Sequence, residues 1–231
     1  MFKPTGYIDE PCEHEQFRQS GDPDANPLTL NPASSVIRVG LIILLRAGFL
    51  IVQIGNIPVS DVNLILLHNI IEICWVSLCY ILIGSTIAFT GNFAGVIGGG
   101  YWIGHEKTDR EKALIGWQSA VVASGISTCC LAGRMHTVGT LIIGAIFSGI
   151  AHPLIMHWAW STDGWMLQNR LREEGQGFYD SGGGALVHST GSLTGLIGCL
   201  VLGRRIHGSQ LNASPASTLV SYFFILVGLQ V

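Results

Sequence analysis

Charged side chains are scarce in this sequence of 231 residues: Asp, Glu, Lys and Arg make up 12 %, whereas hydrophobic residues make up 48 %. The net charge of −3 leaves no excess of basic residues, and a nucleic-acid-binding protein needs a basic face to neutralise phosphates. The few Lys and Arg residues lie almost entirely in short stretches between long apolar runs. The composition therefore excludes nucleic-acid binding and indicates a protein of the lipid bilayer.

Several common motifs are also missing. Five of the six cysteines fall inside apolar runs, where they act as small hydrophobic side chains, and Cys12 has no Cys-x-x-Cys partner. The glycines at 98–100 are not followed by the Gly-Lys-Ser/Thr of a phosphate loop. No basic segment precedes an apolar core within the first 30 residues, as a signal peptide requires. We therefore expect no disulfide framework, metal or cofactor.

The first 35 residues differ from the rest of the chain. They contain six acidic residues and several prolines, without apolar periodicity, which is typical of a solvated segment. We predict a disordered, acidic polar tail at 1–35 and a membrane domain at 36–231.

The membrane domain contains six apolar runs, of which the last is cut off by the end of the sequence. A span needs about 20 mainly apolar residues, and an isolated segment in lipid satisfies its backbone only as a helix. We therefore predict an all-α membrane protein of about six helices. The runs are approximately 36–56, 63–90, 113–133, 137–160, 182–203 and 216–231. In the fifth, Gly191 and Gly195 have the spacing of close helix packing.

Ionisable residues at membrane depth are rare and mark candidate functional sites. The distinctive stretch runs from Asp180 through Gly183 and Gly184 to His188: an acid, a glycine cluster and a histidine at the start of an apolar helix. An acid is favoured there by the helix dipole. The simpler interpretation is a capped helix with one packing histidine. The other candidates within apolar runs are Arg46, Glu72, His152 and His157.

The end of the fourth run allows two interpretations. Trp160 suits the aromatic belt at a membrane surface, and its ring face also suits attraction of a cation. His152 and His157 resemble one histidine box of a di-iron enzyme, but the remaining histidines are scattered singly. Ser189 and Thr190 next to His188 face different directions on a helix, so they form no catalytic pair. We expect no enzyme.

The stretch from Asp180 to His188, followed by Leu202-Gly203-Arg204-Arg205, resembles the signature of the ammonium transporter family, which includes the Rhesus glycoproteins. That signature has an Asp, a glycine pair and a histidine at the start of a small-residue helix that ends in Leu-Gly-basic-Arg. Other similar segments occur in the family's order. They are Ala47-Gly48-Phe49 with Gly55, Asn69 with Glu72, Leu82-Ile83-Gly84 with Ala88-Phe89, Ala132-x-Arg134-Met135, and His157-x-x-Trp160.

The resemblance implies inverted five-helix repeats with a narrow apolar pore between them, assembled as a homo- or hetero-trimer in the plasma membrane. Ammonium would be recruited at an outer vestibule and cross as ammonia, with its proton relayed beside two histidines. Carried over, Trp160 belongs to the vestibule, Asp180 to its electrostatic support, and His188 is the first pore histidine. Gly183, Gly184, Asn69, Glu72, Gly203 and Arg205 are motif residues of the fold.

This sequence also departs from the family. The gating phenylalanine of the third span is absent, with Ser119 or Val121 in its place, and Ser181 replaces the aromatic after Asp180. The sequence stops within the sixth helix, so we expect the N-terminal half of the fold, as a fragment of a longer transporter. The alternatives are a short isoform without transport, or a half-protein that pairs with another chain. The alternative function is that of a non-transporting short membrane subunit or ammonium sensor that assembles with full-length relatives.

Orientation has two conflicting indications. Counting Lys and Arg places the N-terminal tail in the cytoplasm, whereas the family places it outside. We follow the family, because its motif order is the stronger indication.

Overall fold

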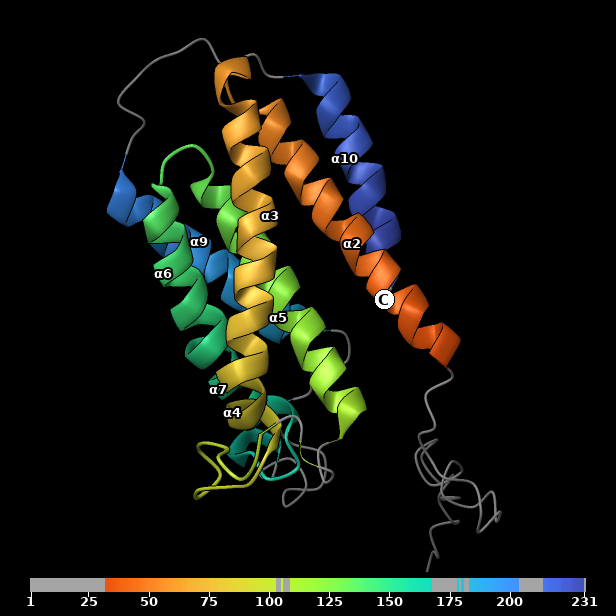
Figure 1. The fold of residues 1–231 in the computed structure, drawn as a ribbon, viewed down its shortest axis with the longest axis vertical. Helices are drawn as coiled ribbons and strands as arrows, with labels where there is room; N and C mark the ends of the chain where they lie inside the picture. The colour runs from red at the N-terminus through yellow and green to blue at the C-terminus, as the bar shows by residue number, and fades with distance from the viewer. Residues whose placement is uncertain are drawn as a thin grey trace, which may run out of the picture.

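The helices of this protein follow the predicted apolar runs. The computed structural model describes residues 32–102, 105, 109–167, 178, 180, 183–203 and 214–230. In this part the helices are α2 (Pro32–Gly55), η1 (Val59–Asp61), α3 (Val62–Cys79), η2 (Tyr80–Gly84), α4 (Ser85–Phe89), α5 (Arg110–Leu131), α6 (Thr137–Ile146), η3 (Phe147–Ala151), α7 (His152–Trp160), η4 (Gly184–Ser189), α9 (Thr190–Leu202) and α10 (Pro215–Gly228). The all-α prediction is confirmed, and Figure 1 shows the bundle they form.

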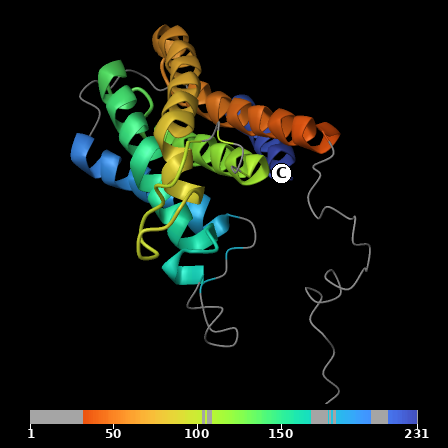
Figure 2. The ribbon, with the colours of Figure 1, turned by 60° about the horizontal axis from the view of Figure 1, so that its bottom comes forward.

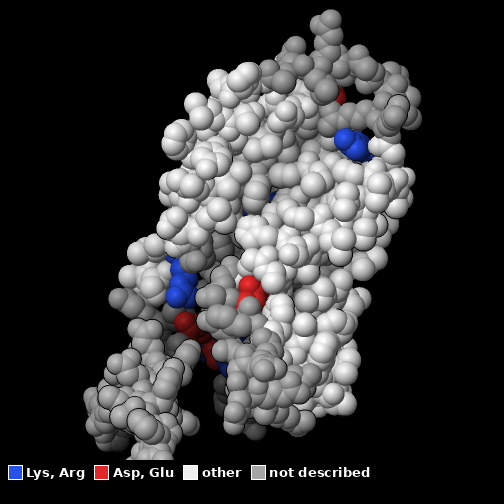
Figure 3. Space-filling view, turned by 180° about the vertical axis from the view of Figure 1, so that it is seen from behind, with Lys and Arg blue, Asp and Glu red and all other residues white. Residues whose placement is uncertain are grey.

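Five of the described helical runs are long and apolar enough to cross a membrane, and α10 is a shorter apolar helix. The outer faces are apolar, as at Leu200 and Val201 of α9, which are 75 % and 80 % exposed. Seen from behind, the described surface carries only a few charged side chains, in small groups (Figure 3). Such a surface suits lipid. Helix α2 begins at Pro32, before the predicted start at 36, and the rest of the predicted tail lies outside the described residues.

Three of the runs contain a π-helical turn: η2, η3 and η4. Proline explains η3, because Pro153 has no N–H to donate to a carbonyl one turn earlier, and the helix adjusts locally. The turns η2 and η3 approach closely at Gly84, where a Cβ atom would lie 2.6 Å from the Ser148 carbonyl oxygen. A glycine is therefore required at this crossing.

Helix α10 returns antiparallel along α2, as Figures 1 and 2 show. The backbone N–H of Ser214 donates to the Gly55 carbonyl at 3.0 Å, which joins the start of α10 to the end of α2. Along the pair, Gly48 lies against Ile225 and Gly228 lies against Leu45. Small residues on each helix thus allow the two backbones to approach.

Helix α5 lies at the centre of the bundle, and all residues from Ala120 to Gly125 are buried. Helix α9 packs on it through glycines: a Cβ atom at Gly191 would lie 2.6 Å from the Ala123 carbonyl oxygen, and one at Gly195 would lie 2.8 Å from Cys130 Sγ. The close packing predicted from the Gly191–Gly195 spacing is confirmed.

A buried polar network ties α2, α3 and α5 together. Arg46 of α2 forms an ion pair with Glu72 of α3, and each side chain is only 3 % exposed. The Ser124 hydroxyl of α5 donates to the same carboxylate, and Arg46 Nη1 donates to the Val121 carbonyl at 3.3 Å. A charge pair at membrane depth is thereby satisfied by a carboxylate, a hydroxyl and a carbonyl.

Candidate functional site

A cavity of about 520 Å³ lies between α2, α5, α7, η4 and α10. Its wall is mainly apolar, with side chains such as Ile42, Leu45 and Val187. Trp160, Asp180 and His188, the three residues predicted for binding and conduction, all line it. The tertiary structure therefore brings together residues from α7 and from the start of the η4–α9 helix.

Trp160 is the last residue of α7, and the chain leaves the helix at Ser161 in an extended conformation. One turn earlier, His157 Nδ1 lies 3.0 Å from the Ala88 carbonyl oxygen, which anchors α7 to the end of α4. A side chain at Gly183 would begin 3.8 Å from Cζ2 of Trp160, so the indole lies beside the start of η4.

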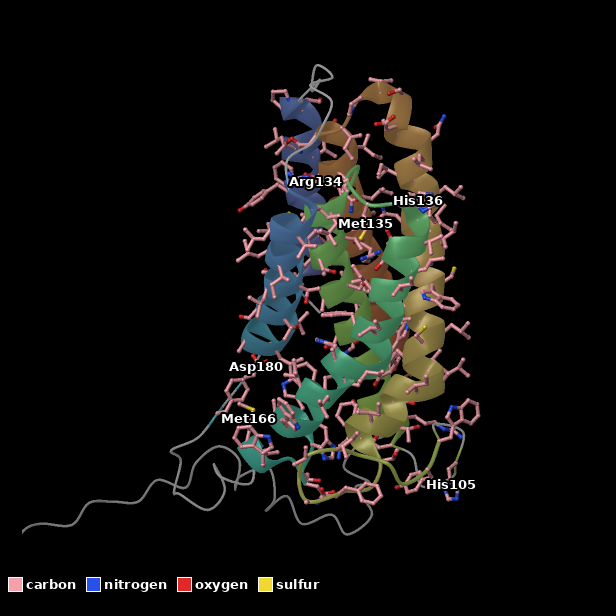
Figure 4. The ribbon with its side chains drawn as sticks, turned by 90° about the vertical axis from the view of Figure 1, so that its left-hand side faces the viewer. His105, Arg134, Met135, His136, Met166 and Asp180 are labelled. Carbon is pink, nitrogen blue, oxygen red and sulfur yellow. The ribbon has the colours of Figure 1, made fainter. Side chains whose placement is uncertain are left out.

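Asp180 caps the helix that carries His188. Its carboxylate accepts hydrogen bonds from the backbone N–H groups of Ala185 and Leu186 at 3.3 and 3.0 Å. Figure 4 shows Asp180 near the end of the bundle that also holds Met166 and His105, opposite the turn at Arg134 to His136. Asp180 therefore caps this helix, as the simpler interpretation of the sequence predicted. Its carboxylate also lines the cavity and places negative charge there.

Gly183 allows this cap to form. Its φ is +71°, a left-handed conformation in which glycine is favoured, and its carbonyl accepts from the Val187 N–H at 2.7 Å. Gly184 lies in open space with no neighbouring atom within 4 Å of a Cβ position. The two glycines of the motif thus differ, because only Gly183 is required by the backbone.

His188 lies in η4, half-buried, and lines the cavity. Within the described residues, neither ring nitrogen of His188 has a hydrogen-bond partner. Its imidazole is therefore available to a group that enters the cavity.

The cavity is also lined by two polar residues that were not predicted as binding residues. Gln118 and Ser119 of α5 line it, and the Ser119 hydroxyl oxygen lies 2.7 Å from His152 Nε2. Val121, the other candidate for the missing phenylalanine, is buried in the core and does not line the cavity. A polar pair in an apolar run was visible in the sequence, but nothing there indicated which helix face meets the cavity.

His152 and His157 have separate environments. His152 contacts Ser119 and Thr190, whereas His157 contacts a backbone carbonyl. In the described part of the chain, no three His, Cys, Asp or Glu residues are arranged to hold a metal ion. The spacing of these two histidines therefore reflects packing on two faces of one helix.

The other predicted motif residues that the structure describes do not line the cavity. Asn69 Nδ2 donates to Gln53 Oε1 at 2.8 Å, and Glu72 pairs with Arg46. Gly203 has a φ of +68° and ends α9. Arg205 lies outside the described residues. Asn69 and Glu72 therefore join α3 to α2.

Lys112 also lines the cavity, and its ammonium group lies 3.9 Å from the Asp109 carboxylate. Asp109 also caps α5 by accepting from the backbone N–H groups of Glu111 and Lys112. The positive charge of Lys112 is thus offset by the Asp109 carboxylate.

Comparison with known proteins gives consistent matches. A family model described as the Ammonium Transporter Family matches residues 33–230. Ammonium transporter 1 member 2 of Oryza sativa subsp. japonica is 31 % identical over 186 residues, which cover 74 % of this chain and 38 % of that protein. Ammonium transporter 1 member 4 of Arabidopsis thaliana is 31 % identical over 171 residues, which cover 71 % and 34 %.

Solved structures share the fold. A structure titled Sensor Amt Protein matches with a TM-score of 0.73 and 22 % identity, over 84 % of this chain and 51 % of that chain. Mep2 of Saccharomyces cerevisiae matches with a TM-score of 0.65 and 18 % identity, over 83 % and 45 %. The chain spans about half the length of these solved structures, and between 34 % and 38 % of the two curated relatives.

Proposed function

Because the chain belongs to the ammonium transporter family, we propose that its cavity is the recruitment site and the first pore segment of a pathway for ammonium or ammonia. It is an integral, multi-pass membrane protein. The family is one of transporters, so the expectation that the chain is not an enzyme is confirmed. The observation that carries the proposal is the meeting of Trp160, Asp180 and His188 around one cavity.

Each of these residues suits one step. The Trp160 ring attracts a cation through its π face, and the Asp180 carboxylate adds negative charge beside it. Transfer of a bare ammonium ion from water into an apolar passage costs much more free energy than transfer of neutral ammonia. The half-buried His188 imidazole accepts or passes the proton that ammonium must leave behind.

The proposal assigns the opposite wall of the pathway to polypeptide outside this sequence. That polypeptide would belong to a longer form of the protein or to a partner chain. We further propose a trimer in the plasma membrane. The assignment of the opposite wall to other polypeptide is supported by the share of the matched structures that this chain covers, about half.

Ammonium binding tests the recruitment site on this chain directly. The detergent-solubilised protein is titrated with ammonium chloride, with the heat of binding measured by isothermal titration calorimetry and sodium chloride as the ionic-strength control. Trp160→Leu is expected to weaken binding by roughly 3- to 30-fold, the range of one cation–π contact. Trp165→Leu is the matched control, because Trp165 is an exposed tryptophan of the same region that does not line the cavity.

Asp180→Asn separates charge from capping, because Asn also caps helices. We expect weaker ammonium binding with the helix retained, and the additional loss of helix stability only in Asp180→Ala. Methylammonium uptake into vesicles, measured on a form that carries the complete pathway, tests His188→Ala. Unchanged binding after Trp160→Leu, or full uptake after both Asp180→Ala and His188→Ala, would overturn the proposal.

A further inference from the structure

His152 lies fully buried behind the cavity wall, where α5, α7 and α9 meet. Its Nε2 atom is 2.7 Å from Ser119 Oγ, and its Nδ1 atom is 3.1 Å from Thr190 Oγ1. The Phe147 ring stacks on the imidazole with centroids 5.2 Å apart. The imidazole is therefore held in one orientation by contacts on both nitrogen atoms and on one face.

The hydrogen bonds determine which nitrogen carries the proton. Thr190 has one hydroxyl proton, and its acceptors are the backbone carbonyls of Leu186 and Val187. Thr190 Oγ1 must then accept from His152, so Nδ1 carries the hydrogen. In the neutral imidazole Nε2 is left as an acceptor, and the Ser119 hydroxyl must donate to it.

This arrangement leaves the acceptor lone pairs of Ser119 unused. Ser119 lines the cavity, and its proton is committed to His152 on the other side of the wall. The neighbouring Gln118 also lines the cavity, and its buried Nε2 atom has no hydrogen-bond partner among the described residues. Two adjacent polar side chains of α5 thus have unused hydrogen-bonding capacity in an otherwise mainly apolar cavity.

We propose that Ser119 is a substrate-contact residue that accepts an N–H hydrogen bond from a small nitrogen compound in the cavity: ammonium, ammonia or methylammonium. His152 is its positioning residue, because it takes the Ser119 proton and so presents the oxygen lone pairs to the cavity. Thr190 holds the imidazole in the tautomer that this requires. The inference rests on the proposed function, since it names a further contact within the same cavity.

Binding to single variants of the full chain tests this contact. Ser119→Ala is expected to weaken ammonium binding by roughly 10- to 150-fold, the effect of one hydrogen bond from a charged donor, and Ser119→Thr is expected to restore it. Ser127→Ala is the matched control, because Ser127 is a buried serine of the same helix that donates to a backbone carbonyl and does not line the cavity.

Two further measurements distinguish positioning from simple packing. In chain labelled with ¹⁵N at the histidine rings, the His152 signals, identified by their loss in His152→Leu, are expected to show a protonated Nδ1 and a bare Nε2. His152→Gln retains an acceptor for the Ser119 proton and is expected to bind ammonium more tightly than His152→Leu.

The outcomes separate this inference from the proposed function. Wild-type affinity in Ser119→Ala, together with lost binding in Trp160→Leu, overturns the Ser119 contact and leaves the recruitment site standing. A His152 ring with a bare Nδ1 overturns the hydrogen-bond arrangement. An absence of any ammonium response in the wild-type chain overturns the proposed function, and the Ser119 contact with it.

Discussion

Removing one member of the Arg46–Glu72 ion pair is expected to destabilise the protein far more than removing both. The pair lies between α2 and α3, with each side chain 3 % exposed, so neither charge is solvated when its partner is lost. Breaking such a pair typically costs about 3–5 kcal/mol, whereas replacing both members by apolar residues is close to neutral. We therefore expect the wild type and the double variant to have similar stability, and both single variants to be less stable than either.

The cost translates into a measurable shift of the melting temperature. For a chain of this length, 1 kcal/mol corresponds to about 2–4 °C, so Arg46→Met and Glu72→Met are each expected to melt about 6–20 °C lower. The double variant Arg46→Met/Glu72→Met should recover most of that loss. Circular dichroism of detergent-solubilised protein at increasing temperature measures all four forms.

A partly exposed ion pair provides the matched control, with the Arg38 and Glu111 side chains 37 % and 14 % exposed. Arg38 lies 4.0 Å from Glu111 and is partly exposed, so Arg38→Met should cost no more than about 1 kcal/mol. The reasoning is refuted if the Arg46 and Glu72 variants melt within the range of Arg38→Met. It is also refuted if the double variant loses as much as the two single variants combined.

Three further predictions use the same melting and binding assays. Gly48→Leu should lower the melting temperature by separating α2 from the backbone of α10, whereas Gly40→Leu on the same helix meets open space and should not; equal effects would contradict the packing. Gly183→Ala should cost about 1–3 kcal/mol, because its φ is +71°, and should weaken ammonium binding, while Gly184→Ala should do neither. Asn69→Leu should cost about 1–3 kcal/mol by leaving its buried amide partner unsatisfied, and an unchanged melting temperature would show that water replaces that bond.

Residues close together in the sequence were the ones whose roles could be predicted. The apolar runs matched helices because hydropathy and backbone satisfaction in lipid are local requirements. The helix start from Asp180 to His188 was predicted for the same reason, since the cap, the glycine and the histidine lie within about two turns.

The partners of buried polar residues could not be predicted in this way. Arg46 and Glu72 were recognised as unusual, but their pairing across 26 residues depends on how α2 and α3 pack. His152 and Ser119, separated by 33 residues, were considered in other roles, one as half of a histidine box and the other as a replacement for a phenylalanine.

The sequence by itself determined the membrane environment, the helices, the family resemblance and the capped start of the helix that carries His188. Only the tertiary structure decided that Trp160, Asp180 and His188 line one cavity, and that Ser119 does so with His152 behind it. The physical reason is that hydropathy and capping act over a few residues, whereas a cavity wall depends on which faces of distant helices meet. Small residues such as Gly191 and Gly195 determine which helix faces pack together, because they allow two backbones to approach closely.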